Sequence, residues 1–249
     1  MRHHIGLLYK NSVREKSVSL IIVCLINNIK RLQMISSIQT VHSPPPNCEL
    51  CPRLVALRDV NRITWPDWHN GPVPSFGPTT AELLIVGLAP GLKGANRTGR
   101  PFTGDFAGDL LYQTLSSFGF SKGQYNQSAD DGLSMRNCRI TNGVRCLPPQ
   151  NKPTGLEVKN CRSFLENEIK VMTRLKIILA LGGVAHTTLV TALGESRSQY
   201  KFLHGAFHEL PGGLVLANSY HCSRYNTNTR RLSEEMFANV FREIQARID

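Results

Sequence analysis

Short apolar runs alternate along this chain with longer segments in which apolar residues recur every three or four positions. The apolar runs at residues 83–86, 177–181 and 214–217 predict buried strands, and the more polar segment 139–144 is a further strand candidate. Helical spacing covers residues 109–118, 154–175, 184–193 and 233–248, and Ser233 is placed to cap the last helix. Strands that alternate with helices predict an α/β fold whose parallel sheet is covered on both faces. Ligands bind at the carboxyl ends of such strands, so the loops after Val86, Ile140 and Ala217 should meet at one place.

The size and charge of the chain limit the classes of function that it can have. Its 249 residues are 41% hydrophobic, which is enough for one sizeable core and excludes a disordered chain. Lys and Arg number 29 against 18 Asp and Glu, a formal net charge of +11 that predicts a polyanionic partner. Seven cysteines at uneven spacings argue against a disulfide framework and favour a reduced compartment with a metal site.

The first 46 residues differ in composition from the rest. They carry six basic residues and a single acid, and their apolar run at 18–26 is well short of the ~20 residues that cross a bilayer, so no membrane span is expected. No small-residue cleavage site follows the run, and an organellar transit peptide fits better than a secretory signal. A non-functional extension upstream of Met34 is the simpler alternative. The segment from Ser43 to Pro46 is predicted to be a linker.

A glycine-rich loop follows the first predicted strand. It runs from Gly87 to Asp105 as GLAPGLKGANRTGRPFTGD, with five glycines and two prolines that would hold Phe102 at a fixed place. It lacks the G-x-x-x-x-G-K-[ST] pattern, so it is not a phosphate-binding P-loop. A phenylalanine such as Phe102 is by itself more typical of a core ring, but the length and rigidity of the loop favour a stacking platform.

Four cysteines have spacings that suit a metal centre. Cys48-x2-Cys51 precedes the first predicted strand and Cys146-x14-Cys161 follows the second. Four thiolates suit either a tetrahedral zinc or an iron–sulfur cluster, and the spacing leaves both open. Of the remaining cysteines, Cys138 is expected to be a small buried core residue.

His221 follows the fourth predicted strand. It falls in the same predicted crevice as Asn142, Phe102 and the glycine-rich loop, which favours a functional role. The histidines without such neighbours, His186, His204 and His208 among them, are expected to be structural.

These motifs together resemble those of the type-5 uracil-DNA glycosylases, DNA-repair hydrolases that carry an iron–sulfur cluster. The resemblance runs from about Asn47 to the C-terminus, and the glycine-rich loop is its most specific part. The other motifs are CPRLVA at Cys51, GPVPSFG at Gly71, DDGL at Asp130, ITNGVRCLPPQNKPT at Ile140, NCRSFLENE at Asn160 and HCSRYNTNTRRL at His221. Cys222, where Pro or Val is common, and a short segment between Arg58 and Gly71 depart from the family pattern.

The resemblance implies a three-layer α/β/α sandwich with a central four-stranded parallel sheet. Residues 47–249 would form the glycosylase domain, preceded by the basic extension 1–46. A structural [4Fe-4S] cluster would be held by Cys48, Cys51, Cys146 and Cys161. The implied partner is DNA that contains uracil or another deaminated base, and the chain is expected to act as a monomer in the cytoplasm at the nucleoid, or in mitochondria if the extension is a transit peptide.

The resemblance also implies roles for individual residues. Phe102 would stack on the extruded base, Asn142 would recognise its polar edge and His221 would contact the carbonyl that becomes negative. Related glycosylases of other types hold the attacking water with a polar side chain in the first motif, where this chain has only Leu88 and Ala89. Asn96 is therefore our candidate for orienting the water. Gly87, Leu88 and Ala89 would complete the base pocket, and DNA would be bound by Arg224, Arg230 and Arg231, which as single residues could also form a solvated basic face.

Two alternatives remain at this stage. A non-catalytic iron–sulfur or zinc protein that binds nucleic acid could keep the fold, the cysteines and the charge, but it would not need Phe102, Asn142 and His221 together. A glycosylase for hypoxanthine or xanthine is the other alternative, because Ala89 leaves the pocket uncrowded.

Overall fold

The computed structural model describes residues 43–249. The expectations for the basic extension 1–46 therefore lie outside the described residues, except for its last four. No helix in this described part is long and apolar enough to cross a membrane.

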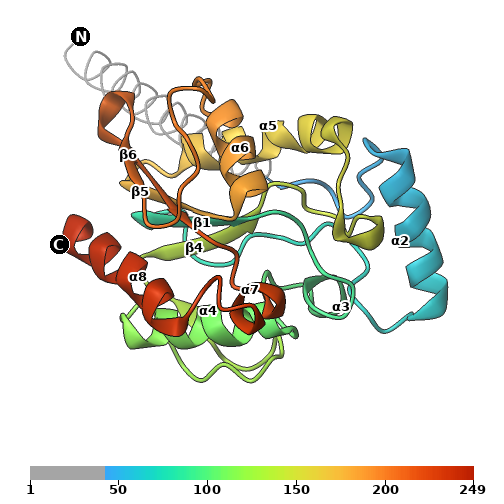
Figure 1. Ribbon diagram of the computed structural model, residues 1–249. Coiled ribbons are helices and arrows are strands. Elements are labelled where there is room, and N and C mark those ends of the chain that lie inside the picture. The colour runs from blue at the N-terminus through green and yellow to red at the C-terminus, as the bar shows by residue number, and fades with distance from the viewer. Residues whose placement is uncertain (1–42) are drawn as a thin grey trace, which may run out of the picture. The chain divides into compact units, whose positions relative to one another are not determined.

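The core of the molecule is a five-stranded sheet in the order β4-β1-β5-β7-β6 (Figure 1). Its four parallel strands are β1 (Leu83–Gly87), β4 (Cys138–Asn142), β5 (Ile177–Leu181) and β7 (Val215–Ser219), so the predicted four-stranded parallel sheet is confirmed. Every residue of these strands is buried, which explains the continuous apolar runs of β1 and β5, whereas β4 and β7 also bury polar residues such as Arg139 and Asn218. The prediction missed β6 (Phe207–Glu209), which pairs antiparallel with β7 and makes the sheet mixed.

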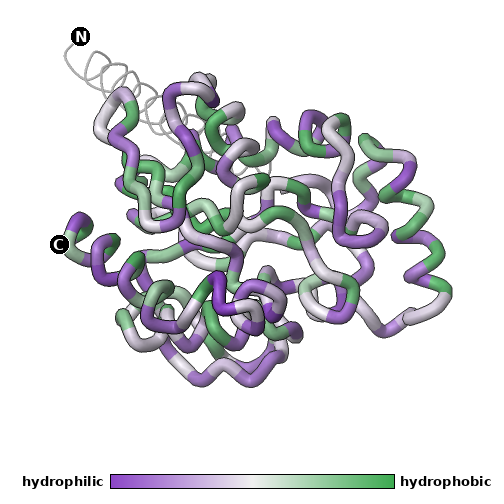
Figure 2. Tube along the Cα trace, in the orientation of Figure 1, coloured by the Kyte–Doolittle hydropathy of each residue, from purple (hydrophilic) through white to green (hydrophobic). Residues whose placement is uncertain are grey.

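Helices cover both faces of the sheet, as predicted. The helices α4 (Phe106–Ser117) and α8 (Glu234–Ile248) pack on one face, and α5 (Gly155–Val171) and α6 (Gly183–Ala192) pack on the other. Because side chains alternate along a strand, β1 sends Leu83 and Ile85 to the α4 side and Leu84 and Val86 to the α5 side. Figure 2 shows hydrophobic positions in the central strands and, alternating with hydrophilic ones, along the helices around them.

Side chains at the helix starts explain where these helices begin. Asp105 accepts a hydrogen bond from Gly108 N and caps α4, and Ser233 caps α8 as predicted. Thr154 and Glu157 form a reciprocal capping box at the start of α5. This helix ends at Val171, four residues before the predicted end.

Helix α2 (Pro52–Thr64) was not predicted. Its buried residues are Leu54, Arg58 and Asn61, so two of the three positions that face the protein are polar and the apolar period is weak. Other short elements complete the chain: α3 (Ala95–Thr98), α7 (Arg224–Asn228), the strand pair β2 (Ser121–Lys122) and β3 (Ser134–Met135), and single 3-10 turns at Pro149–Asn151 and Pro211–Gly213.

The GPVPSFG segment lies along the outer edge of β4. Phe76 and Ile140 exchange both backbone hydrogen bonds, at 2.9 and 2.8 Å, and Val73 N donates to Arg145 O at 2.7 Å. The motif therefore pairs with the edge strand of the sheet.

Candidate active site

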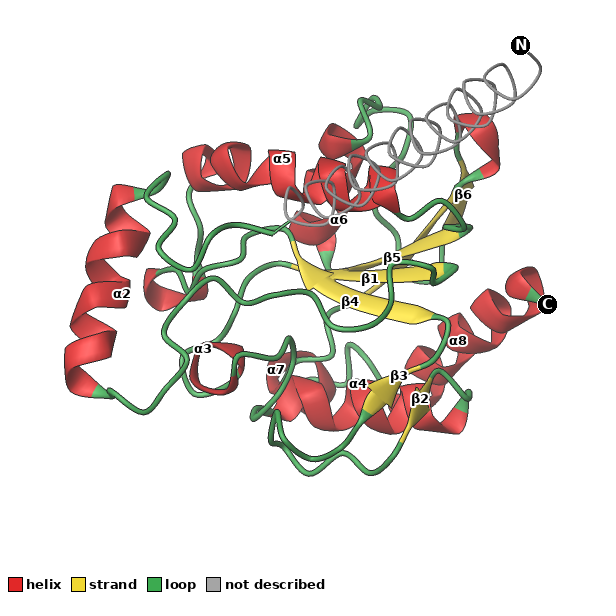
Figure 3. Ribbon diagram, turned by 180° about the vertical axis from the view of Figure 1, so that it is seen from behind, coloured by secondary structure: helices red, strands yellow, loops and turns green. Residues whose placement is uncertain are grey.

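The carboxyl ends of the parallel strands open into a cavity of about 430 Å³. Figure 3 shows these ends facing the loops that lead to α2, α3 and α7. The cavity brings together six of the predicted site residues: Leu88, Ala89, Phe102, Asn142, His221 and Arg224. The predicted convergence of the three loops is thus observed.

Asn142 lines this cavity, and the predicted pocket residue Gly87 lies directly behind Asn142 and Phe102 without lining the cavity itself. Gly87 and Asn142 are paired in register at the ends of β1 and β4. A Cβ atom on Gly87 would lie 2.5 Å from both Asn142 Oδ1 and Phe102 Cζ, so only glycine fits here. The Asn142 side chain is 3% exposed, and its amide makes no hydrogen bond with any described residue. Its donor and acceptor therefore remain available to a ligand.

Phe102 and His221 lie next to each other in the cavity wall. Their rings are 5.8 Å apart at an angle of 29°. The backbone of Phe102 has φ 53°, a left-handed conformation that costs free energy in a bulky residue. The Phe102 ring is therefore held in the cavity by the loop around it.

His221 is held in a neutral form. Desolvation by the surrounding protein lowers the pKa of its imidazole to about 4. The following turn is fixed by Asn226 Nδ2, which donates to His221 O at 2.8 Å, and by Cys222 Sγ, which donates to Ala107 O at 3.3 Å. A neutral imidazole can donate one hydrogen bond into the cavity.

Asp105 is a cavity residue for which the sequence suggested no role. Burial raises the pKa of its carboxyl, and the backbone N–H groups of Gly108 and Ala107 partly oppose this shift. An Asp that follows a glycine turn and precedes a helix is a typical cap, so sequence reasoning could have located it but could not have placed its carboxylate in the cavity. Ser223 and Asn151 also line the cavity and were not predicted.

The predicted DNA-binding arginines differ in position. The Arg224 guanidinium lies over the Phe106 ring, 5.1 Å from its centroid, and lines the cavity. Arg230 and Arg231 are exposed and do not line it, and Arg231 lies over the Tyr220 ring at 4.5 Å.

Asn96 does not reach the cavity. It is 2% exposed, and its Nδ2 donates to Asn70 Oδ1 at 2.9 Å. The short α3 helix thus directs this side chain toward Asn70 in the loop before β1, and Asn96 is not among the residues that line the cavity. Of the polar residues in the glycine-rich loop, the structure brings Asp105 to the cavity instead.

The four predicted metal ligands line a second, smaller cavity between α2, α5 and the loop after β4. Among the described residues, no three His, Cys, Asp or Glu side chains are placed to hold a single metal ion. Two polar groups approach the sulfur atoms: Arg145 N donates to Cys161 Sγ at 3.4 Å, and Asn160 Nδ2 lies 3.8 Å from Cys51 Sγ.

The surroundings of these cysteines fit an anionic group. Arg58 is 7% exposed and lines the cavity; its Nη1 donates to Cys48 O at 2.8 Å, and its Nε makes no hydrogen bond but lies 3.8 Å from a carboxylate oxygen of the exposed Asp59. Burial raises the pKa of the Cys146 thiol to about 12, so a bound metal would be needed to keep it as a thiolate. Four thiolates on iron would leave a net negative charge, which the Arg58 guanidinium would offset.

The remaining histidines and cysteines discussed above have structural surroundings. Both ring nitrogens of His186 are hydrogen-bonded, to Asn218 Oδ1 at 2.7 Å and to Tyr200 O at 2.8 Å. His204 Nδ1 accepts from Tyr220 N at 3.1 Å, and Cys138 is fully buried in the core. These contacts agree with the structural roles expected for them.

Comparison with known proteins identifies the family. Residues 74–245 match the family model described as the Uracil DNA glycosylase superfamily. The type-5 uracil-DNA glycosylase of Thermus thermophilus is 45% identical over 202 residues, which cover 79% of this chain and 91% of that protein. The type-5 uracil-DNA glycosylase of Pyrobaculum aerophilum is 40% identical over 205 residues, 80% of this chain and 88% of that protein. The chain therefore belongs to the uracil-DNA glycosylase superfamily, within its type-5 group.

Proposed function

We propose that this chain removes uracil from DNA by hydrolysing the N-glycosidic bond of a nucleotide that has been rotated out of the strand. The observation that carries the proposal is the cavity at the carboxyl ends of the sheet, where Phe102, Asn142, His221 and Asp105 meet. A base inside a duplex cannot be attacked at its sugar carbon, so the enzyme needs an enclosed pocket of this kind. A non-catalytic nucleic-acid-binding protein would not need these four residues together.

The base would be recognised by stacking and by its polar edge. The Phe102 ring offers a flat apolar surface, and base–aromatic stacking contributes about 1–3 kcal/mol. The free amide of Asn142 can accept from N3–H of uracil and donate to its O4 atom. Leu88 and Ala89 would form the remaining wall of the base pocket without polar side chains, with Gly87 directly behind Asn142 and Phe102.

His221 would stabilise the leaving group. Cleavage of the bond leaves positive charge on the sugar and negative charge on uracil. A neutral imidazole that donates to the uracil carbonyl strengthens its hydrogen bond as the negative charge develops, which is the typical action of an anion-stabilising donor. The low pKa of His221 keeps it in this neutral form over the physiological range.

Asp105 replaces Asn96 as our candidate for positioning water. Water adds across the bond: its oxygen binds the sugar carbon C1′, and one of its protons ends on N1 of uracil. A carboxylate in the cavity wall can accept a hydrogen bond from this water and stabilise the positive sugar. The buried amide of Asn96 is already engaged with Asn70, so we assign it a structural role in the loop.

The four cysteines would hold a [4Fe-4S] cluster. The family resemblance, the cavity that the four cysteines share and the Arg58 guanidinium that lines it support a cluster. When bound, the cluster serves as a cross-link between α2, α5 and the loop that begins at Cys146. That loop ends at Asn151, which lines the base cavity.

DNA phosphates would be bound by the basic residues around the cavity. Arg224 stands at the cavity itself, and Arg230 and Arg231 follow it on the same exposed segment. We place the whole reaction in residues 47–249, because every candidate residue lies there. The extension 1–46 would add only nonspecific attraction to DNA.

An excision assay tests the proposal and its range of bases. Oligonucleotides that carry a single uracil, hypoxanthine or xanthine are incubated with the full chain, and abasic sites are detected as alkali-labile breaks. Uracil excision is expected, and an oligonucleotide with thymine serves as the uncleaved control. Absence of cleavage on all three deaminated bases would favour the non-catalytic alternative, and faster excision of hypoxanthine or xanthine than of uracil would assign the enzyme to deaminated purines.

A further inference from the structure

The DDGL motif has no role in the reaction described so far, yet its second aspartate is tied to the loop that carries Phe102. Both Asp131 oxygens bind the Arg100 guanidinium at 2.7 Å, and they also accept from Asn126 N at 2.9 Å and Leu133 N at 3.0 Å. The Asp131 side chain is 1% exposed. Neither Asp131 nor Arg100 lines the base cavity.

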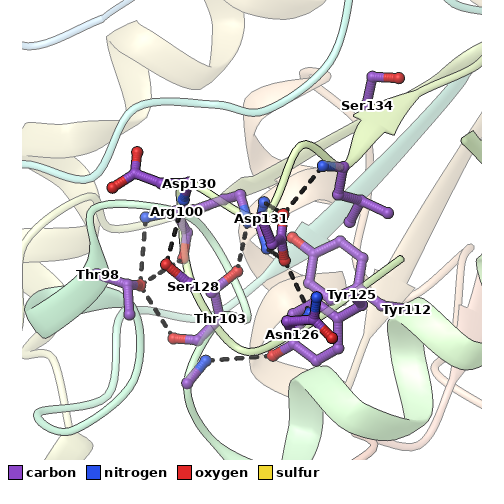
Figure 4. Close-up of polar contacts among 12 residues, drawn as sticks. Thr98, Arg100, Thr103, Tyr112, Tyr125, Asn126, Ser128, Asp130, Asp131 and Ser134 are labelled. Atoms are coloured by element: carbon purple, nitrogen blue, oxygen red, sulfur yellow. Dashed lines mark hydrogen bonds and ion pairs between the residues drawn. The ribbon is translucent and has the colours of Figure 1, made fainter. Parts of the chain in front are cut away.

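Arg100, whose guanidinium is fixed by Asp131, also binds the glycine-rich loop that carries Phe102. Its Nε donates to Thr103 Oγ1 at 2.8 Å (Figure 4). Its guanidinium also lies over three rings, 5.0 Å from the Phe76 centroid, 5.4 Å from Tyr112 and 5.7 Å from Tyr125. A planar cation held between a carboxylate and aromatic faces has little freedom to move.

Tyr125 binds the backbone on both sides of the strained residue. Its hydroxyl donates to Phe102 O at 3.3 Å and accepts from Gly104 N at 3.2 Å. A Cβ atom on Gly108 would lie 2.5 Å from this hydroxyl and 1.9 Å from Phe102 O, so helix α4 approaches as closely as glycine permits. The loop cannot relax toward α4.

We propose that Asp131 and Tyr125 are positioning residues for base recognition, which hold the Phe102 ring in the base cavity through Arg100 and the loop backbone. This inference rests on the proposed role of Phe102 in stacking on uracil. The left-handed φ of Phe102 is unfavourable for a free loop, so the conformation persists only while its neighbours hold it. In the loop, hydroxyl groups donate to carbonyl oxygens in three contacts, and one backbone N–H donates to a hydroxyl: Tyr112 to Pro101 O, Tyr125 to Phe102 O, Thr98 to Thr103 O, and Gly104 N to the Tyr125 hydroxyl.

The test compares two neighbouring aspartates. Asp131→Asn weakens the ion pair with Arg100, whereas Asp130→Asn alters an exposed side chain for which no contact is drawn in Figure 4. Single-turnover excision of uracil should fall about 10–100-fold in Asp131→Asn, the usual effect of misplacing a reacting group from a distance. Asp130→Asn should keep the parent rate.

Binding separates positioning from a general loss of structure. A duplex with 2′-fluoro-2′-deoxyuridine, which resists hydrolysis, still presents the base, and a duplex with a tetrahydrofuran abasic site does not. Asp131→Asn should bind the fluorinated duplex about 10-fold or more weakly and the abasic duplex with parent affinity. Tyr125→Phe, which removes one hydroxyl, should show the same selectivity with a loss of about 3–10-fold and keeps the test valid if Asp131→Asn fails to fold.

A double-mutant cycle shows whether the effect passes through Phe102. In a Phe102→Leu background, Asp131→Asn or Tyr125→Phe should cost less than 3-fold in rate, because the ring that they position is gone. Equal losses in both backgrounds, or equal losses for fluorinated and abasic duplexes, would overturn the inference. The parent chain and Asp130→Asn should both excise uracil. If neither does, the proposed function is wrong; if both do and Asp131→Asn does so equally fast, only the positioning role is wrong.

Discussion

The imidazole of His221 faces the ring of Phe102 at a centroid distance of 5.8 Å and an angle of 29°. The two residues come from the loops after β7 and β1, which the parallel sheet brings to one edge. In the mechanism that we propose, a base that stacks on Phe102 would therefore be brought to the imidazole, and recognition and leaving-group stabilisation would occur in one wall of the cavity. Most of the predictions below test this arrangement.

Replacement of His221 by Ala should slow bond cleavage by about 100–1000-fold, since one donor to the developing anion is lost. DNA affinity should change little. Single-turnover rates on a uracil oligonucleotide measure the effect, with His208→Ala, which does not line the cavity, as the matched control. Parent rates in His221→Ala would give His221 a purely structural role.

The low pKa of His221 also predicts a pH dependence of stability. The unfolded imidazole titrates near 6.5 and the folded one near 4, so the unfolded state binds more protons between these values. The free energy of unfolding should therefore decrease as the pH falls from about 6.5 to about 4, with a contribution on the order of 2–3 kcal/mol from this residue. The free energy of unfolding is measured by urea denaturation at a series of pH values for the parent and for His221→Gln, which should lack this contribution. If the two proteins lose stability in parallel as the pH falls, the low pKa is wrongly assigned to His221.

Asp105→Asn should lower the single-turnover rate by about 100-fold or more, because the negative charge that positions water is lost. Asn is also a good helix cap, so the start of α4 should be preserved. The parent rate should decrease at acidic pH as the carboxyl, whose pKa burial raises, becomes protonated. Asp109→Asn, in the same helix but outside the cavity, is the control, and an equal loss in both variants would refute a special role for Asp105.

Asn142→Asp should shift base preference from uracil toward cytosine. An ionised carboxylate has no donor for O4 of uracil but can accept from the amino group of cytosine. No hydrogen bond within the described residues fixes the parent amide, so its discrimination must come from the closely packed Gly87 and Phe102 around it. Excision of uracil and of mispaired cytosine is measured with both proteins. Unchanged uracil excision without any cytosine excision would require a different residue for recognition.

Cys146→Ser should cost the protein most of its iron. Anaerobically purified parent is expected to contain about four irons per chain, with a broad absorbance near ~400 nm. Cys138→Ala, which removes a buried thiol from the core, should keep the iron and lose only some stability. Stoichiometric zinc in the parent, or full iron in Cys146→Ser, would contradict the cluster assignment.

Whether a helix or strand could be predicted from the sequence depends on how many of its buried positions are apolar. Strand β5 (Ile177–Leu181) was predicted to the residue because all of its side chains are buried and its sequence is an uninterrupted apolar run. Helix α2 escaped prediction because Arg58 and Asn61 face the protein there, and β6 escaped because it has only three residues, none of them fully buried. Hydrophobic pattern fails where polar groups replace apolar ones in a packed interface.

The same limit applies to the site. Phe102, Asn142 and His221 could be located because Asn142 ends a predictable strand and the other two lie in loops that follow such strands, and the topology of a parallel sheet brings these positions together. The directions of side chains in the irregular glycine-rich loop could not be predicted. Asn96 turns to Asn70 and Asp105 turns to the cavity, and these orientations depend on backbone angles that the residue types alone do not determine.

The two edges of the central sheet have a consequence for association between molecules. Open strand edges recruit other chains through unpaired backbone groups, and proteins avoid this by shortening or covering them. Here Phe76 occupies backbone groups of β4 at one edge, and the strand at the other edge, β6, spans only three residues. Within residues 43–249, few backbone donors and acceptors of this sheet remain for edge-to-edge pairing, so the sheet itself should not promote aggregation even though its interior strands are largely apolar.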